Sequence, residues 1–165
     1  MHTLINNRNP IFSKMIFSIL NDTLGDVGLN VFEIYGISLK AKMVVLSSCN
    51  TGTGNLLRGE GILSLARGFI YSGSKSVAMS LWEVDDKSGT DVMKSFYRNL
   101  KNGNSKSVAL RKARLKYLRS AGQLRSHPYF WSTLVIYGDD SPLYYKKRDL
   151  TGDSVQEKSP IPLRI

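Results

Sequence analysis

The feature that most constrains the fold is an unbroken apolar run, Met43-Val44-Val45-Leu46, which continues into Ser47 and Ser48. Continuous apolar residues are typical of a strand that other layers cover on both faces. The run therefore predicts a buried central strand. The segment Asn50-Thr51-Gly52-Thr53-Gly54 comes shortly after it and is typical of a turn.

The only cysteine of the chain, Cys49, lies between this strand and the turn. Open α/β sheets bind their ligands at the carboxyl ends of their strands, so Cys49 is a candidate catalytic nucleophile. The alternative is a buried structural cysteine that behaves as a small apolar side chain.

Other segments predict helices and strands around the central strand. The N-cap candidates are Asn30, Asp85 or Asp86, and Ser105. The order strand, helix, strand, two helices, strand favours an α/β fold in three layers with a mostly parallel sheet. Helices are expected at residues 31–35, 62–71, 87–100 and 105–122, and strands at residues 14–18, 76–82 and 130–137.

The length of 165 residues fits one domain, which we expect to span residues 1–145. Residues 146–165 form a basic and polar tail that contains Pro160 and Pro162 and has no regular period. We expect this tail to be disordered.

Several classes of protein are excluded by composition. A single cysteine excludes an internal disulfide and a cysteine-rich zinc site. Because only His2 and His127 could join Cys49 as metal ligands, we expect no metal. We also expect no cofactor. The chain has no apolar run of about 20 residues and no signal-peptide core, so we expect a cytoplasmic protein without a membrane span.

The net charge of +10 is concentrated late in the chain, where residues 101–148 hold eleven Lys or Arg and two acidic residues. Such a patch can attract nucleic acid or an acidic partner. A solvated helix face is the interpretation that we favour, since no aromatic residues are interleaved for base stacking.

A cysteine nucleophile needs a base, because a free thiol is mostly protonated at neutral pH. His2 precedes Cys49 by 47 residues, close to the spacing of about 50 in the caspase pattern. His127 follows Cys49 and stands before Pro128 at the entry to a predicted strand. We expect His127 to pack against Tyr129 and Trp131 there.

The motif Val44-Val45-Leu46-Ser47-Ser48-Cys49-Asn50-Thr51-Gly52-Thr53-Gly54, followed by Gly59-Glu60-Gly61, resembles the cysteine motif of CHAT domains. These are caspase-like domains often found beside tetratricopeptide repeats. The likeness reaches to about Tyr144 through Ser64-Leu65-Ala66-Arg67, Gly73, Ser80-Leu81-Trp82, Val84-Asp85-Asp86, Phe96-Tyr97, His127-Pro128-Tyr129 and Trp131.

The resemblance implies a role for the first residues of the chain. Met1-His2-Thr3 stands in place of an Ala-Thr-His-Gly-like motif, so His2 maps onto the catalytic histidine of the family. Thr3 replaces the usual glycine, whose backbone N–H helps to form the oxyanion hole. The resemblance implies that this chain lacks the N-terminal strands of a caspase-like sheet. We therefore expect a C-terminal portion of a larger, repeat-containing bacterial protein, with His2 at a loose terminus.

The leading functional hypothesis is a cysteine endopeptidase domain with a Cys49–His2 dyad. Its backbone N–H groups of Cys49 and Thr3 would stabilise the oxyanion. Asp85, Asp86 or Glu60 could bind a basic substrate residue, although helix capping is the simpler role for the two aspartates. One alternative is an inactive protein-interaction module. The other is binding of nucleic acid or an acidic partner by the basic helix, which is the helix expected at residues 105–122.

Overall fold

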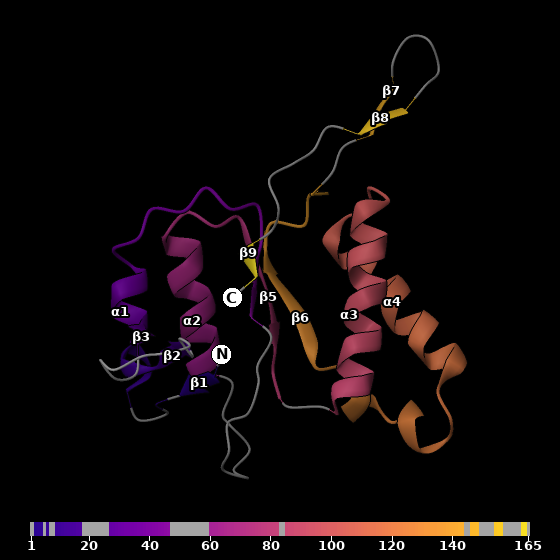
Figure 1. The fold of residues 1–165 in the computed structure, drawn as a ribbon, viewed down its shortest axis with the longest axis horizontal. Coiled ribbons are helices and arrows are strands. Elements are labelled where there is room, and N and C mark those ends of the chain that lie inside the picture. Colours follow the sequence, from indigo (N-terminus) through magenta and orange to yellow (C-terminus); the bar gives the residue numbers. More distant parts are fainter. Residues whose placement is uncertain are drawn as a thin grey trace. The chain divides into compact units, whose positions relative to one another are not determined.

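The computed structural model describes residues 2–4, 6, 9–17, 27–46, 60–82, 85–143, 146–148, 154–156 and 163–164. The chain divides into two compact units (Figure 1). Unit 1 comprises residues 1–83 and 162–165, and unit 2 comprises residues 84–161. Each unit is described by itself below.

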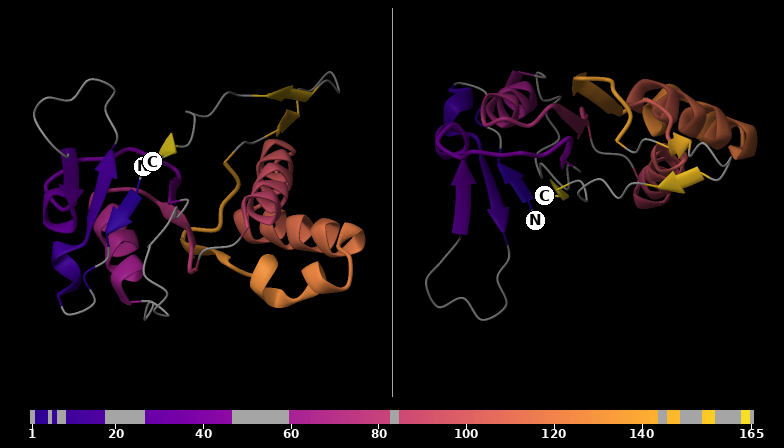
Figure 2. Two further views of the ribbon diagram at one scale, coloured as in Figure 1. Left: turned by 60° about the horizontal axis from the view of Figure 1, so that its bottom comes forward. Right: turned by 90° about the horizontal axis from the view of Figure 1, so that it is seen from above.

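An antiparallel sheet forms one part of unit 1 (Figure 2). Its strands are β1 (His2–Leu4), β2 (Lys14–Phe17) and β3 (Val27–Asn30), in that order. The short 3-10 helix η1 (Pro10–Phe12) precedes β2. The side chain of Met15, at the centre of β2, is fully buried.

A short helix, α1 (Val31–Ile34), follows β3 directly. The backbone N–H of Asn30 donates to Glu33 Oε2 at 2.6 Å, and its side-chain amide donates to the same oxygen at 2.8 Å. This contact confirms Asn30 as the N-cap of the helix. The buried side chain of Ile34 lies against Gly68, where an added Cβ would stand 3.4 Å from Ile34 Cγ2.

The predicted central strand is present as β4 (Val44–Leu46). It pairs in parallel with β5 (Ser76–Ser80), Val44 opposite Val77 and Leu46 opposite Met79. On its other side it pairs in parallel with β9 (Leu163–Arg164). Consecutive residues of β4 and β5 are all buried up to Met79, which confirms strands covered on both faces.

The helix that precedes β5 in the chain is α2 (Glu60–Tyr71), close to the predicted 62–71. Its buried residues Leu65, Ala66 and Phe69 have the expected helical spacing. Unit 1 thus contains helices together with both parallel and antiparallel strand pairs, and the predicted α/β class is confirmed. The three-layer, mostly parallel arrangement stays a prediction.

The connection from α2 to β5 is held by backbone bonds to the segment that leads into β4. Leu39 N–H donates to Ser72 O at 2.6 Å, and Lys75 N–H donates to Ala41 O at 3.0 Å. Ser76 Oγ donates to Lys42 O at 2.9 Å. These bonds place the starts of β4 and β5 side by side.

Unit 2 contains two long helices that pack against each other, α3 (Asp86–Lys101) and α4 (Lys106–Ser120). Ser88 Oγ and Tyr117 Oη are joined by a 2.7 Å hydrogen bond between the buried faces. The N-cap of α4 is Ser105, as predicted. The buried apolar residues of the two helices include Val92, Phe96, Leu100, Ala109, Leu110 and Ala113.

The last predicted strand begins later than expected. Two 3-10 helices, η2 (Leu124–Ser126) and η3 (Pro128–Phe130), occupy the segment before β6 (Leu134–Gly138). Pro128 O accepts bonds from the N–H groups of Trp131 and Ser132, and this turn excludes an extended backbone. Farther on, β7 (Lys146–Arg148) and β8 (Ser154–Gln156) pair antiparallel within the segment predicted to be a tail.

We predict that Gly73→Ala destabilises unit 1 strongly. Gly73 has a φ of 103°, and a Cβ there would overlap the carbonyl oxygen of Leu39. The strained backbone and the overlap together should lower the free energy of unfolding by about 2–4 kcal/mol. Urea unfolding followed by circular dichroism measures the change.

Gly122→Ala is the matched control, because a Cβ on Gly122 meets nothing within 4 Å. Its free energy of unfolding should change by less than about 0.5 kcal/mol. Equal effects of the two substitutions would contradict the structural role of Gly73.

Candidate functional site

The candidate nucleophile follows the carboxyl end of the buried strand β4. The strand ends at Leu46, three residues before Cys49 in the sequence. Because β4 and β5 are parallel, their carboxyl ends meet at the same edge of the sheet, where Leu81 and Trp82 follow β5. Cys49 and the turn predicted at residues 50–54 lie outside the described residues.

The candidate base lies on β1. His2 pairs with Ile16 of β2, and Thr3 pairs with Met15. The expectation that His2 hangs from a loose terminus is therefore wrong for its backbone, because strand pairing with β2 fixes it. The pairing of the His2 and Cys49 side chains stays a prediction.

Of the proposed substrate contacts, Asp85 acts as the N-cap of α3. Its Oδ2 accepts from Ser88 N–H at 3.1 Å and lies 3.5 Å from Arg125 Nη2. Hydrogen bonding to Ser88 lowers the pKa of Asp85, with help from the Arg125 charge and against the effect of burial. This arrangement confirms the helix-capping interpretation.

The other two acidic candidates each stand at the start of a helix. Asp86 is the first residue of α3 and its side chain is exposed. Glu60 is the first residue of α2, and its side chain is outside the described part of the chain. Substrate contact by Asp85, Asp86 or Glu60 stays a prediction.

His127 has a local structural role. Its Nδ1 accepts a 3.3 Å hydrogen bond from Tyr129 N–H and thereby caps η3. The ring is exposed to solvent. The predicted contact with Tyr129 is thus made to its backbone, and packing of His127 against Trp131 stays a prediction.

Two cations of the basic helix point inward and are structural. Lys106 is buried, and its Nζ donates to Asp139 O at 2.8 Å and to Ser141 O at 2.7 Å. Arg114 Nη2 donates to Leu134 O at 2.6 Å, and burial lowers the pKa of its guanidinium. These two residues are thus removed from the charge available to a nucleic acid.

The sequence analysis missed this inward use of charge, because residue type alone assigns lysine and arginine to the surface. One signal was available. Asp139 and Asp140 follow the predicted last strand and are the only acidic residues in 101–148. In the structure Asp140 accepts from Ser107 N–H at 2.6 Å, next to Lys106, and so fixes the start of α4.

Neither a metal cluster nor a membrane helix was found in the part of the chain that the structure describes. No group of three or more His, Cys, Asp or Glu among those residues could hold a metal ion. No helix among them is both long enough and apolar enough to cross a bilayer.

Comparison with known proteins gives matches over most of the chain. The family model of the CHAT domain matches residues 2–139. Tetratricopeptide repeat protein 28 of Mus musculus and that of Homo sapiens are each 30% identical to the chain over 120 residues. The match covers 73% of this chain and 5% of either relative, so it spans a small part of their length.

We predict that Asp85→Ala lowers the free energy of unfolding by about 1 kcal/mol at neutral pH, because α3 loses its N-cap. The pKa of this carboxylate is lower in the folded state, so its contribution exists above the ordinary aspartate pKa of about 4. It is lost as the pH falls through the folded-state pKa. Urea unfolding of both proteins between neutral pH and pH about 3 measures the difference.

Asp86→Ala is the control, since it removes the same charge from the first helical position without removing the cap. It should cost a few tenths of a kcal/mol, about the value of a charge near a helix terminus. Equal losses for the two variants would show that the cap contributes nothing of its own.

Proposed function

The chain belongs to the CHAT domain family, and from this premise we propose that it is a cysteine peptidase domain with a Cys49–His2 dyad. One observation carries the proposal. The strand β4 is buried on both faces and is parallel to β5, and in the sequence its carboxyl end is followed three residues later by Cys49, the only cysteine of the chain. Open α/β sheets place their reactive groups at the carboxyl ends of their strands.

In the proposed mechanism His2 accepts the proton of the Cys49 thiol, and the thiolate attacks the carbonyl carbon of a peptide bond. A new carbon–sulfur bond forms while the carbonyl π electrons move to oxygen. Collapse of this intermediate breaks the carbon–nitrogen bond, and the His2 imidazolium protonates the leaving amine. Water, deprotonated by His2, then hydrolyses the thioester and releases the thiol.

The oxyanion of the intermediate requires hydrogen-bond donors close to the attacked carbonyl. We assign this role to the backbone N–H groups of Cys49 and Thr3, the positions that match the family motif. Threonine has the N–H that the role requires, although its β-branched side chain restricts the backbone more than the usual glycine.

An acidic side chain past β5 would favour a basic residue before the cleaved bond. Among the acidic candidates, Asp86 is exposed, whereas the carboxylate of Asp85 is held by Ser88 and Arg125. Asp86 is therefore the better candidate for such a contact.

The proposal also includes the surrounding architecture. We propose a caspase-like sheet in three layers, and tetratricopeptide repeats elsewhere in the protein, as in the name of the relatives.

We predict that a peptidyl chloromethyl ketone with a lysine next to the reactive group alkylates Cys49. Because Cys49 is the only cysteine, the mass of the intact chain reports a single modified site. His2→Ala should slow this alkylation by about 100-fold or more, the usual contribution of a positioned general base. Cys49→Ser should abolish it.

His127→Ala is the matched control, since it removes the other histidine, which is exposed and caps η3. It should leave the alkylation rate unchanged. If His2→Ala has no effect while Cys49 still reacts, the dyad is wrong. If folded protein does not react at all, the inactive interaction module replaces the peptidase.

A further inference from the structure

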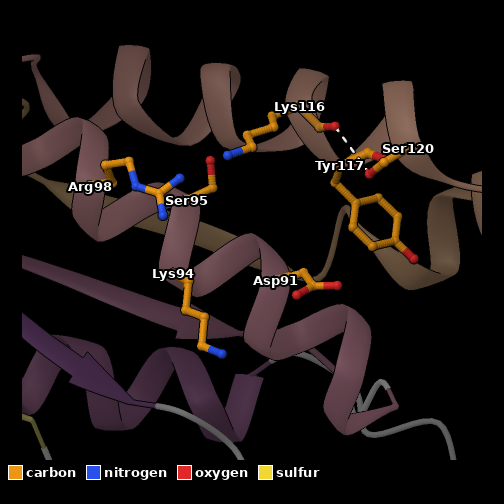
Figure 3. Close-up of a pocket in the computed structure, with 7 residues that line it drawn as sticks. All are labelled: Asp91, Lys94, Ser95, Arg98, Lys116, Tyr117 and Ser120. Carbon is orange, nitrogen blue, oxygen red and sulfur yellow. Dashed lines mark hydrogen bonds between the residues drawn. The ribbon is translucent and has the colours of Figure 1, made fainter.

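A pocket of about 240 Å³ lies between α3 and α4, within unit 2 (Figure 3). Its walls come from both helices, so their packing fixes its shape. It is lined by Asp91, Lys94, Ser95 and Arg98 of α3 and by Lys116, Tyr117 and Ser120 of α4. Three cations thus share the pocket with one carboxylate.

Within the described part of the chain, none of the three cations forms an ion pair with a carboxylate, Asp91 included. The ion pairs found there are those of Lys106 with Asp139 and of Arg125 with Asp85. In Figure 3 the ends of the Arg98 and Lys116 side chains converge on Ser95 from the two helices, while Lys94 points away. Two like charges that converge in this way repel each other unless an anion lies between them.

A buried hydroxyl lies where these two cations converge. The Ser95 side chain is 5% exposed, and its Oγ has no hydrogen-bond partner among the described residues. Serine hydroxyls inside helices usually bond to a carbonyl one turn earlier, as Ser120 Oγ does with Lys116 O. An unsatisfied buried hydroxyl is unfavourable, so a ligand oxygen at this point would stabilise the site.

We propose that this pocket is an anion site that binds a phosphoryl group. One phosphoryl oxygen accepts from Ser95 Oγ, and others accept from the Arg98 guanidinium and the Lys116 ammonium. Arginine and lysine beside a hydroxyl are typical donors to phosphate. The Asp91 carboxylate lies toward the Tyr117 side of the pocket in Figure 3, away from these three donors.

The size of the pocket limits the ligand. Pockets for drug-sized ligands have volumes of about 300–1,000 Å³. The smaller volume here fits orthophosphate or the phosphoryl end of a small monoester. The proposal does not depend on the peptidase proposal, because none of these residues belongs to the Cys49–His2 dyad.

The test is a titration of the full-length chain with sodium phosphate, followed by ¹⁵N–¹H nuclear magnetic resonance. Sodium chloride of matched ionic strength is the reference. We expect saturable shifts of the Ser95 and Lys116 amide signals with phosphate and none with chloride. A second titration with O-phosphoserine distinguishes the sources: tighter binding than orthophosphate indicates a monoester, and weaker binding indicates the free ion.

Charge variants separate the pocket from the general basic surface. Arg98→Gln and Lys116→Gln should each weaken phosphate binding about tenfold or more, the loss expected for one charge-assisted hydrogen bond. Arg111→Gln removes one charge from an exposed position of the same helix α4 and should leave the affinity nearly unchanged. Equal weakening by Arg111→Gln, or no saturable binding by the wild type, would overturn the proposal.

Ser95→Ala provides a readout that does not depend on charge. Without phosphate this variant should melt about 2–4 °C higher than the wild type, because it no longer buries an unsatisfied hydroxyl. Phosphate should raise the melting temperature of the wild type and have a smaller effect on the variant. Equal stabilisation of both proteins by phosphate would exclude Ser95 from the site.

Discussion

The parallel pairing of β4 with β5 is the constraint on which the candidate site depends. Neither strand can exchange its backbone bonds for water, because both are buried. Their starts are held together by the bonds from Leu39 to Ser72 and from Lys75 to Ala41. Ser72 Oγ adds bonds to Ile34 O and Gly68 O, so the end of α2 and the end of α1 join the same network. A thiol after β4 therefore follows a rigid support, as catalytic groups require.

Unit 2 is organised by charges that point inward. Lys106 is almost fully buried, and its Nζ is satisfied by Asp139 O, Asp139 Oδ2 and Ser141 O, which ties the start of α4 to the chain after β6. Arg114 connects the middle of α4 to the start of β6 through Ser132 O and Leu134 O. Removing one partner of a buried charge lowers the free energy of unfolding by more than a surface ion pair contributes to it. The basic character of α4 thus has a structural origin in part, and its remaining exposed cations are available for anions.

Sequence patterns predicted the elements whose signals are local. The continuous apolar run gave β4, and the caps at Asn30, Asp85 and Ser105 gave the starts of three helices. Sequence patterns did not predict the features that depend on contacts between distant segments of the chain. No strand is predicted at residues 27–30 from the sequence, yet pairing with β2 makes them the strand β3. Likewise, residue type does not distinguish Arg114, which points inward, from Arg111, which is exposed. Only the helical spacing does, because Arg114 lies four residues after the buried Leu110 and three before the buried Tyr117. Of the proposed dyad, Cys49 is predicted from its place after the apolar run, whereas His2 depends on the family motif, since its spacing from Cys49 alone is a weak signal.

The two members of that dyad belong to differently paired parts of unit 1. His2 lies on a strand supported by β2, whereas Cys49 follows a strand supported by β5. Among the described contacts, a route between them runs from β3 to α1, and from α1 to α2 through the close approach of Ile34 to Gly68. It continues from α2 through the Ser72–Ser76 connection to β5 and β4. In the proposed dyad a displacement of about 1 Å costs roughly a hundredfold in rate, so the proposed proton transfer depends on each packed step of this route. The proposed chemistry therefore also depends on the close packing at Gly68 and on the hydrogen bonds of Ser72, which form joints of this route.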